Sequence, residues 1–264
     1  MKYALVTGAS SGMGVHYTLQ LAQRGYGIII VSNRHDENIA TANKLHSVVH
    51  ASDVRIIDAD LTLSFSPEII YNTVKGWNLE VEVLVSNAGI LLFSTLVKTP
   101  VEKLERIISL HCLAPVKLIR LFAQDMIMRN KGYILIVSSA TAWMPFPTIS
   151  HYGSTKAFLK NFSRSLWYEM RRHGVGVTTV YPGAVDTPLY ELSEKKRGLL
   201  RRLGIIQSPE RTVSIALKAL FRKHYRCVPG FFTKITVFLC IIVPPFVFSQ
   251  LLKIPTVKRI LNKV

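Results

Sequence analysis

Tyr152 and Lys156 are the residues of this sequence whose types and spacing most directly indicate chemistry. They open a predicted helix over residues 151–173 with the spacing Tyr-x-x-x-Lys, which puts both side chains on one helix face. An ammonium group beside a phenol lowers the phenol's pKa because it favours the phenolate. A tyrosine tuned in this way can pass a proton to or from a carbinol oxygen. Such pairs are also common in helices for structural reasons, so the surroundings decide the interpretation.

A serine at the end of the preceding predicted strand adds a second group to the pair. Ser138 and Ser139 end an apolar run over residues 132–138, and the hydroxyl of Ser139 could hydrogen-bond the same substrate oxygen. The carboxyl ends of parallel strands meet at one edge of a sheet, where such sheets bind ligands. We therefore expect Ser139, Tyr152 and Lys156 to converge on one crevice.

A glycine-rich turn near the N-terminus predicts a dinucleotide site. The first predicted strand, over residues 3–7, runs into Gly8, Gly12 and Gly14, and a helix over residues 15–24 follows. A turn of this kind brings backbone N–H groups and a helix N-terminus close to a pyrophosphate.

The end of the second predicted strand, over residues 27–32, favours NADP over NAD. Asn33 and Arg34 follow that strand, and neither is acidic. An acid at this point would hold the ribose 2′-hydroxyl of NAD and would repel the 2′-phosphate of NADP. The alternative interpretation of Arg34 is a solvated loop residue.

Short apolar runs alternate with helical patterns along the chain, which is typical of parallel sheets covered by helices on both faces. We therefore expect an α/β fold with a doubly wound (Rossmann) sheet and right-handed crossovers. The expected strands are residues 3–7, 27–32, 54–58, 81–86, 132–138 and 176–181. A further helix is expected to begin near Ser66, which would be its N-cap, with Pro67 in its first turn. Another helical region is expected over residues 99–130, with a break near Ala114 and Pro115.

Together these motifs resemble the short-chain dehydrogenase/reductase family over residues 1–228. Residues 7–14 resemble its cofactor fingerprint, Asp60 and Leu61 its adenine contacts, and residues 181–187 its nicotinamide-binding segment. The cofactor-binding residues implied are Gly8, Ser10, Ser11, Gly12, Met13, Gly14, Asn33, Arg34, Asp60, Leu61, Asn87, Ala88, Gly89, Tyr152, Lys156, Pro182, Gly183, Val185 and Thr187.

The resemblance also implies catalytic roles. Tyr152 is then the acid and base, Lys156 lowers its pKa and binds the nicotinamide ribose, and Ser139 orients the carbonyl. His111 stands where the family often has a fourth catalytic residue, an asparagine that works largely through its main-chain carbonyl. A histidine keeps that carbonyl. Its imidazole could join the proton relay, or it could be a packed and hydrogen-bonded core residue.

The net charge of +17, from 33 Lys and Arg against 16 Asp and Glu, indicates an anionic partner. Nucleic acid is not expected, because no recognised motif or basic–aromatic pattern accompanies the charge. Much of the excess falls in residues 195–226, directly before the most apolar part of the chain, which favours a membrane surface. The three cysteines predict reduced thiols and no metal site, and we expect a cytoplasmic protein that could associate with a membrane.

Residues 229–264 form an apolar C-terminal extension, in which 235–252 carry no charge. They could line a hydrophobic substrate tunnel and a dimer surface, lie in a membrane interface, or cross a bilayer. Family members that act on long-chain 3-oxoacyl thioesters or on steroids have a similar layout. We therefore expect an NADPH-dependent reductase of a lipid-like ketone that assembles as a homodimer or homotetramer. The alternative is a non-catalytic, dinucleotide-binding scaffold or sensor at a membrane.

Overall fold

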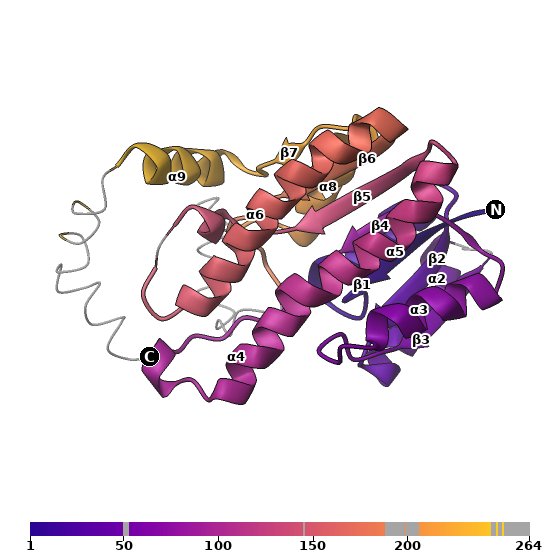
Figure 1. Cartoon of the computed structure of the whole chain (residues 1–264), viewed down its shortest axis with the longest axis horizontal. Helices are drawn as coiled ribbons and strands as arrows, with labels where there is room; N and C mark the ends of the chain where they lie inside the picture. Colours follow the sequence, from indigo (N-terminus) through magenta and orange to yellow (C-terminus); the bar gives the residue numbers. More distant parts are fainter. Residues whose placement is uncertain are drawn as a thin grey trace.

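Seven parallel strands form one sheet at the centre of the folded molecule (Figure 1). The computed structural model describes residues 1–49, 53–144, 146–187 and 206–243, together with 198, 247 and 250. The strands are β1 (Lys2–Thr7), β2 (Gly27–Ser32), β3 (Val54–Asp58), β4 (Glu80–Ser86), β5 (Gly132–Val137), β6 (Val175–Val180) and β7 (Arg226–Cys227). Their order is β3-β2-β1-β4-β5-β6-β7, so the chain reverses its direction of winding between β1 and β4. The predicted doubly wound fold is confirmed.

Helices cover both faces of this sheet. The helices are α1 (Gly12–Ala22), α2 (His35–Val49), α3 (Ser66–Gly76), α4 (Val101–Ile108), α5 (Ala114–Met128), α6 (Ser150–Met170), α8 (Pro209–Phe221) and α9 (Phe231–Ile242). Buried residues of α3, α5 and α6 pack on one face of the sheet. Buried residues of α1, α2 and α8 pack on the other.

The apolar runs of the sequence form strands because their side chains alternate between two buried faces. In β1 and β2, Leu5 and Ile29 join the core beneath α3, α5 and α6. Their neighbours Val6 and Ile30 join the core beneath α1, α2 and α8. All four are fully buried, so neither strand has a polar face.

Two helices lie outside the sequence-based expectation. Helix α2 is rich in polar residues and has no strong apolar pattern. Helix α8 begins with the residue types of a helix N-terminus, although no helix was expected there. Ser208 caps α8 by accepting the N–H of Arg211, and Pro209 stands at its first turn. The predicted N-cap of α3 was wrong by one residue, because Phe65 occupies that position and the hydroxyl of Ser66 donates to the carbonyl of Asp60.

The long helical region before β5 is interrupted by a π-helical turn, Ser109–Leu113, one turn earlier than expected. Pro115 has no N–H, so it cannot continue the α-helical hydrogen bonding of the residues before it. The run Val101–Met128 is long and apolar enough to span a membrane, yet 56% of its most apolar window is buried. Its side chains Leu118 and Phe122 belong to the core, which accounts for the apolarity by packing within the fold.

Candidate active site

The turn between β1 and α1 has no room for side chains at two of its glycines. Gly8 adopts a φ of +63°, and a Cβ there would lie 2.8 Å from Ala88 Cα. A Cβ on Gly14 would lie 1.9 Å from the carbonyl oxygen of Gly8. The N-cap residue of α1, Ser11, makes no side-chain capping bond, so the first-turn N–H groups have no side-chain acceptor. This bare turn and uncapped helix end fit the pyrophosphate of a dinucleotide.

A cavity of about 300 Å³ extends from this turn to the ends of β2 and β3. It is lined by nine predicted cofactor residues: Gly8, Ser10, Ser11, Asn33, Arg34, Asp60, Leu61, Ala88 and Gly89. Arg106 of α4 also lines it and lies 3.8 Å from Asp60 Oδ2. No motif marks Arg106, because only the packing of α4 brings it to the cavity.

Two serines hold the loop that carries Arg34 against the glycine turn. Ser32 Oγ donates to Ser10 Oγ and accepts the N–H of Arg34, both at 3.0 Å. The guanidinium of Arg34 pairs with Glu37 at 3.0 Å, and both side chains are largely exposed. Exposed pairs of this kind contribute only about 0–1 kcal/mol, so Arg34 can exchange this partner for a ligand anion.

The Asn87 side chain connects the ends of β1 and β4. Its amide donates to the carbonyls of Thr7 and Gly8 at 3.0 and 3.2 Å. In return, Thr7 Oγ1 accepts the N–H groups of Asn87 and Ala88. These bonds fix the segment that leads to Gly89, which lines both the 300 Å³ cavity and the smaller one beside it.

The ends of β5 and α6 bring Ser139, Tyr152 and Lys156 together, and all three side chains are buried. Lys156 Nζ donates to the carbonyl of Val137 at 3.0 Å and lies 5.6 Å from the centre of the Tyr152 ring. Burial lowers the pKa of Lys156 to about 8. Ser139 Oγ accepts the N–H of Thr141 at 3.2 Å, which leaves its own hydrogen to donate.

A smaller cavity of about 70 Å³ lies directly in front of these side chains. Its walls include nine predicted cofactor residues: Met13, Asn87, Gly89, Tyr152, Lys156, Pro182, Gly183, Val185 and Thr187. The segment after β6 is held in place when the N–H of Ala140 donates to the carbonyl of Pro182 at 2.9 Å. Gly12 and Gly14 are the two residues of the predicted cofactor set that line neither cavity, and they belong to the glycine turn instead.

A third, mostly apolar cavity of about 320 Å³ begins where the small one ends. Its apolar wall comes from Leu91, Phe93, Met144, Phe146 and Ile149, and α9 adds Phe232, Thr233 and Thr236. Ser139, Tyr152 and Gly183 line both this cavity and the small one. The two hydroxyl groups therefore stand where the small cavity, which predicted cofactor residues line, meets the apolar cavity.

Helix α9 is fixed against this site at its first turn. Gln207 Nε2 donates to the carbonyl of Pro229 at 3.0 Å and to Thr233 Oγ1 at 3.2 Å. Gly230 adopts a φ of +84°, and a Cβ there would lie 1.5 Å from Gln207 Nε2. A Cβ on Gly183 would likewise meet Thr233 Oγ1 at 2.5 Å. The close packing at these two glycines sets the position of α9 beside the segment that follows β6.

His111 lies behind Tyr152 with both ring nitrogens engaged inside the protein. Nε2 accepts the N–H of Ile90 at 3.0 Å, so the ring proton is assigned to Nδ1, which donates to Thr155 Oγ1 at 2.9 Å. Thr155 then donates to the carbonyl of Tyr152 at 2.8 Å. Burial, and then the charge of Lys156, hold the pKa of His111 well below its usual value. The imidazole is therefore neutral and ties the start of α6 to the loop after β4.

The main-chain carbonyl of His111 has a different environment. The residue that would close its α-helical hydrogen bond is Pro115, which has no N–H to donate. The carbonyl lies in the π-helical turn Ser109–Leu113 and lacks this donor. π-helical turns of this kind often occur at functional sites. This carbonyl can accept a hydrogen bond from water.

Residues 2–198 match the protein-family model described as short chain dehydrogenase. The chain belongs to this family. The predicted family is confirmed. Within the described residues there is no group of three or more His, Cys, Asp or Glu side chains that could hold a metal ion.

The curated relatives of this short-chain dehydrogenase carry two kinds of name. The very-long-chain 3-oxoacyl-CoA reductase of Ajellomyces capsulatus is 31% identical over 192 residues, which cover 72% of this chain and 57% of the relative. The 17-beta-hydroxysteroid dehydrogenase type 3 of Homo sapiens is 33% identical over 191 residues, which cover 71% and 60%. The chain thus spans about three fifths of the length of these relatives.

Solved structures agree with the fold. A short-chain dehydrogenase from Sphingobium yanoikuyae, in complex with NADPH, is 27% identical with a TM-score of 0.77, and the match covers 87% of this chain and 88% of that one. A 7beta-hydroxysteroid dehydrogenase gives a TM-score of 0.83 at 21% identity, with 92% of each chain covered. The second likeness concerns the fold alone.

Parts of the dehydrogenase site were missed in the sequence, and parts of the sequence interpretation lie outside the described residues. Thr141 follows no motif, and only tertiary packing places it at the apolar cavity. One expectation for residues 229–264 was that they line a hydrophobic tunnel, and Phe232, Thr233 and Thr236 of α9 do line this cavity. The basic residues 195–202, apart from Gly198, and most of the extension beyond residue 243 lie outside the part that the structure describes.

Proposed function

We propose that this chain interconverts a ketone and a secondary alcohol with a nicotinamide dinucleotide, and that it is an NADPH-dependent reductase of lipid-like ketones. The observation that carries the proposal is the wall shared by the small and the apolar cavities. Ser139, Tyr152 and Gly183 line both. A ketone in the apolar cavity would present its oxygen to two hydroxyl groups beside the dinucleotide crevice.

The dinucleotide would supply the hydride. Tyr152 would give its phenolic proton to the substrate oxygen during reduction and take it back during oxidation. Ser139 would donate a hydrogen bond to the same oxygen, since its Oγ already accepts the N–H of Thr141. Lys156 places a positive charge near the phenol in a buried site, where charges interact more strongly than in water. This charge favours the phenolate that remains after the proton has moved.

The preference for NADPH is supported by the charges around the 300 Å³ cavity. Arg34 and Arg106 both line it, and Asp60 is the one carboxylate among the described residues that line it. Asp60 accepts the N–H of Thr62 at 2.9 Å and lies near Arg106, so its charge is partly compensated. A 2′-phosphate beside Arg34 would replace that residue's exposed pairing with Glu37.

A lipid-like substrate is supported by the apolar cavity and by the names of the relatives. One name denotes a ketone on a very long acyl chain, and the other denotes a secondary alcohol on a steroid. Thr141 Oγ1 is buried beside this cavity and has no hydrogen-bond partner among the described residues. Its hydroxyl could donate to a second carbonyl close to the ketone, which a 3-oxoacyl thioester has. This observation favours the oxoacyl class over an isolated ketone.

The direct experiment is NADPH oxidation by the purified full chain with a panel of ketones. The panel holds 3-oxoacyl thioesters of increasing chain length, steroid ketones and short water-soluble ketones, with mass spectrometry to identify the alcohol. We expect stoichiometric alcohol formation, fastest with long oxoacyl thioesters and faster with NADPH than with NADH. Tight NADPH binding without turnover of any ketone would contradict the proposal and favour a non-catalytic, dinucleotide-binding protein.

A further inference from the structure

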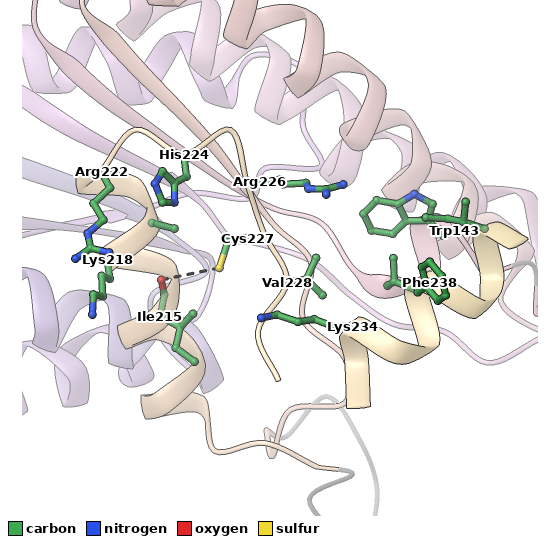
Figure 2. Close-up of a pocket in the computed structure, with 13 residues that line it drawn as sticks. Trp143, Ile215, Lys218, Arg222, His224, Arg226, Cys227, Val228, Lys234 and Phe238 are labelled. Atoms are coloured by element: carbon green, nitrogen blue, oxygen red, sulfur yellow. Dashed lines mark hydrogen bonds between the residues drawn. The ribbon is translucent and has the colours of Figure 1, made fainter. Parts of the chain in front are cut away.

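A second large cavity lies on the other side of α9 from the apolar cavity. It has a volume of about 560 Å³ and opens between α8, β7 and α9 (Figure 2). Thr233 and Thr236 of α9 line the apolar cavity, whereas Lys234, Phe238 and Ile241 line this second one. Helix α9 is therefore a wall shared by the two cavities. The reaction proposed above makes no use of the larger one.

Among the described residues, the Lys, Arg, His, Asp and Glu side chains that line this cavity are all of the basic types. They are Lys218, Arg222, His224, Arg226 and Lys234, and every one of them is exposed. None of the ion pairs found among the described residues involves them. In Figure 2, Lys218 and Arg222 project from α8 on one side, and Lys234 extends from α9 into the space between the helices. Basic groups gathered without acidic neighbours create a positive potential that attracts anions.

Helix α9 is apolar around most of its circumference. Its buried residues are Thr233 and Val237, and its remaining large apolar side chains are exposed to solvent: Phe231, Phe232, Ile235, Phe238, Leu239, Ile241 and Ile242. A contiguous exposed apolar surface of this kind marks an interaction site in a folded protein. An apolar helix beside a group of Lys and Arg side chains has the composition of a helix that lies in the interface of an anionic membrane.

We propose that the basic cavity and the exposed side of α9, together the α9 surface, bind an anionic phospholipid bilayer. Lipid phosphates would bind the basic side chains, and the apolar side chains of α9 would lie among the acyl chains. A soluble phosphate compound would give the exposed apolar helix no partner. A second copy docked through the same surface would bring two sets of cations face to face, which like-charge repulsion disfavours.

The position of α9 gives this binding a consequence for substrate access. Because α9 also lines the apolar cavity, a bilayer bound at the α9 surface would lie next to the cavity that we assign to a lipid-like ketone. This consequence rests on the proposed function, whereas the binding of lipid does not. Lipid binding is therefore tested without substrate or cofactor.

The test is co-sedimentation of the full chain with vesicles of phosphatidylcholine, either alone or mixed with phosphatidylglycerol. The charge variant is Lys218→Glu with Arg222→Glu. Its control is Lys44→Glu with Lys103→Glu, which changes the net charge equally at exposed cations on α2 and α4. We expect binding to the anionic vesicles, a loss of roughly tenfold or more in the charge variant, and less than about twofold in the control.

A second pair of variants tests the apolar part of the α9 surface. Phe238→Ser with Ile241→Ser should weaken binding to the anionic vesicles several-fold. The control is Phe65→Ser with Ile69→Ser at the start of α3, which should not weaken binding. Both pairs are exposed, so the two variants remove similar exposed apolar side chains. Thermal unfolding of each variant shows whether it folds. All four variants leave the residues beyond 243 unchanged, so a selective loss is assigned to the α9 surface.

Several results would overturn the proposal. They are absence of vesicle binding, equal binding to neutral and anionic vesicles, or equal losses in the variants and their controls. Complete release of the protein by inorganic phosphate would assign the surface to a soluble phosphate compound. Self-association that the charge variant abolishes, without vesicle binding, would assign it to a second copy. Turnover of a short soluble ketone, measured separately, shows whether the proposed reaction stands when lipid binding fails.

Discussion

The imidazole of His111 meets the phenol ring of Tyr152 edge-on, with ring centroids 5.6 Å apart and ring planes inclined at 79°. Edge-to-face contacts of this kind contribute about 0.5–1.5 kcal/mol beyond the area that they bury. Both imidazole nitrogens are already used, one by the N–H of Ile90 and one by Thr155. His111 is therefore a positioning residue whose ring supports Tyr152, and its main-chain carbonyl lacks the α-helical donor because Pro115 has no N–H.

Replacing His111 tests this assignment. His111→Ala should lower the free energy of unfolding by about 2–3 kcal/mol, because it leaves the buried N–H of Ile90 without an acceptor and loses the bond to Thr155. His111→Asn offers an amide acceptor and donor in place of the ring and should recover much of that loss. It should also keep most of the turnover, because the main-chain carbonyl is unchanged.

Urea unfolding and the rate of NADPH oxidation check this prediction together. The wild type should lose stability as the pH falls below 6.5, because the unfolded histidine takes up a proton that the folded one does not. His111→Asn should lack this contribution. An Asn variant that is stable but inactive would give the imidazole a chemical role and contradict the assignment.

The lowered pKa of Lys156 predicts that the free energy of unfolding of the ligand-free protein rises with pH. Burial lowers its pKa from the ordinary 10.5 to about 8. Between these values the unfolded chain holds a proton that the folded chain has released, so the free energy of unfolding increases with pH. The rise from this group should be about 2 kcal/mol between about pH 8 and about pH 9.5. Lys156→Met should remove it, and equal pH slopes for wild type and variant in urea unfolding would contradict the prediction.

Arg34 should distinguish the two dinucleotides. Arg34→Ala should raise the KM for NADPH about tenfold and leave that for NADH nearly unchanged, because the lost contact is a charge-assisted bond to the 2′-phosphate. Arg172→Ala, which removes another exposed arginine in the turn Arg171–His173 after α6, is the matched control. Steady-state kinetics with both cofactors make the comparison. A similar change for NADPH and NADH would show that Arg34 does not recognise the phosphate.

Because α9 forms one wall of the apolar cavity, a larger side chain on this wall should weaken the binding of long substrates more than that of short ones. Thr236→Trp puts an indole into the apolar cavity and should raise the KM for long 3-oxoacyl thioesters, with little effect on short ones. Ile235→Trp is the control, since this residue is 40% exposed and is not among those lining either cavity beside α9. If both variants impair long substrates equally, the apolar cavity is not where the chain of the substrate binds.

The parts of the site that depend on local spacing could be predicted from the sequence. The helix that holds Tyr152 and Lys156 fixes their relation, and the glycine turn is set by backbone space at Gly8 and Gly14. Strand β5 ends beside Ser139 because its apolar run ends there. In each case a few neighbouring residues determine the geometry, so one stretch of sequence carries enough information.

The parts that depend on packing between distant segments could not be predicted. Arg106 reaches the 300 Å³ cavity only through the position of α4, and Thr236 lines the apolar cavity only because Gln207 holds the first turn of α9. The π-helical turn at His111 is a further example. Pro115 marked a break in the helix, but the sequence did not show that the break would be a π-turn lying before the proline.

The most direct test of the proposed chemistry is the rate of ketone reduction by Tyr152→Phe against the wild type at saturating NADPH. Phenylalanine keeps the ring and its contact with His111 but has no proton to give. General acid–base catalysis contributes about a hundredfold to ten-thousandfold, so the rate should fall by at least about a hundredfold while NADPH still binds. Unchanged turnover of the same ketone by Tyr152→Phe would contradict the account at its centre.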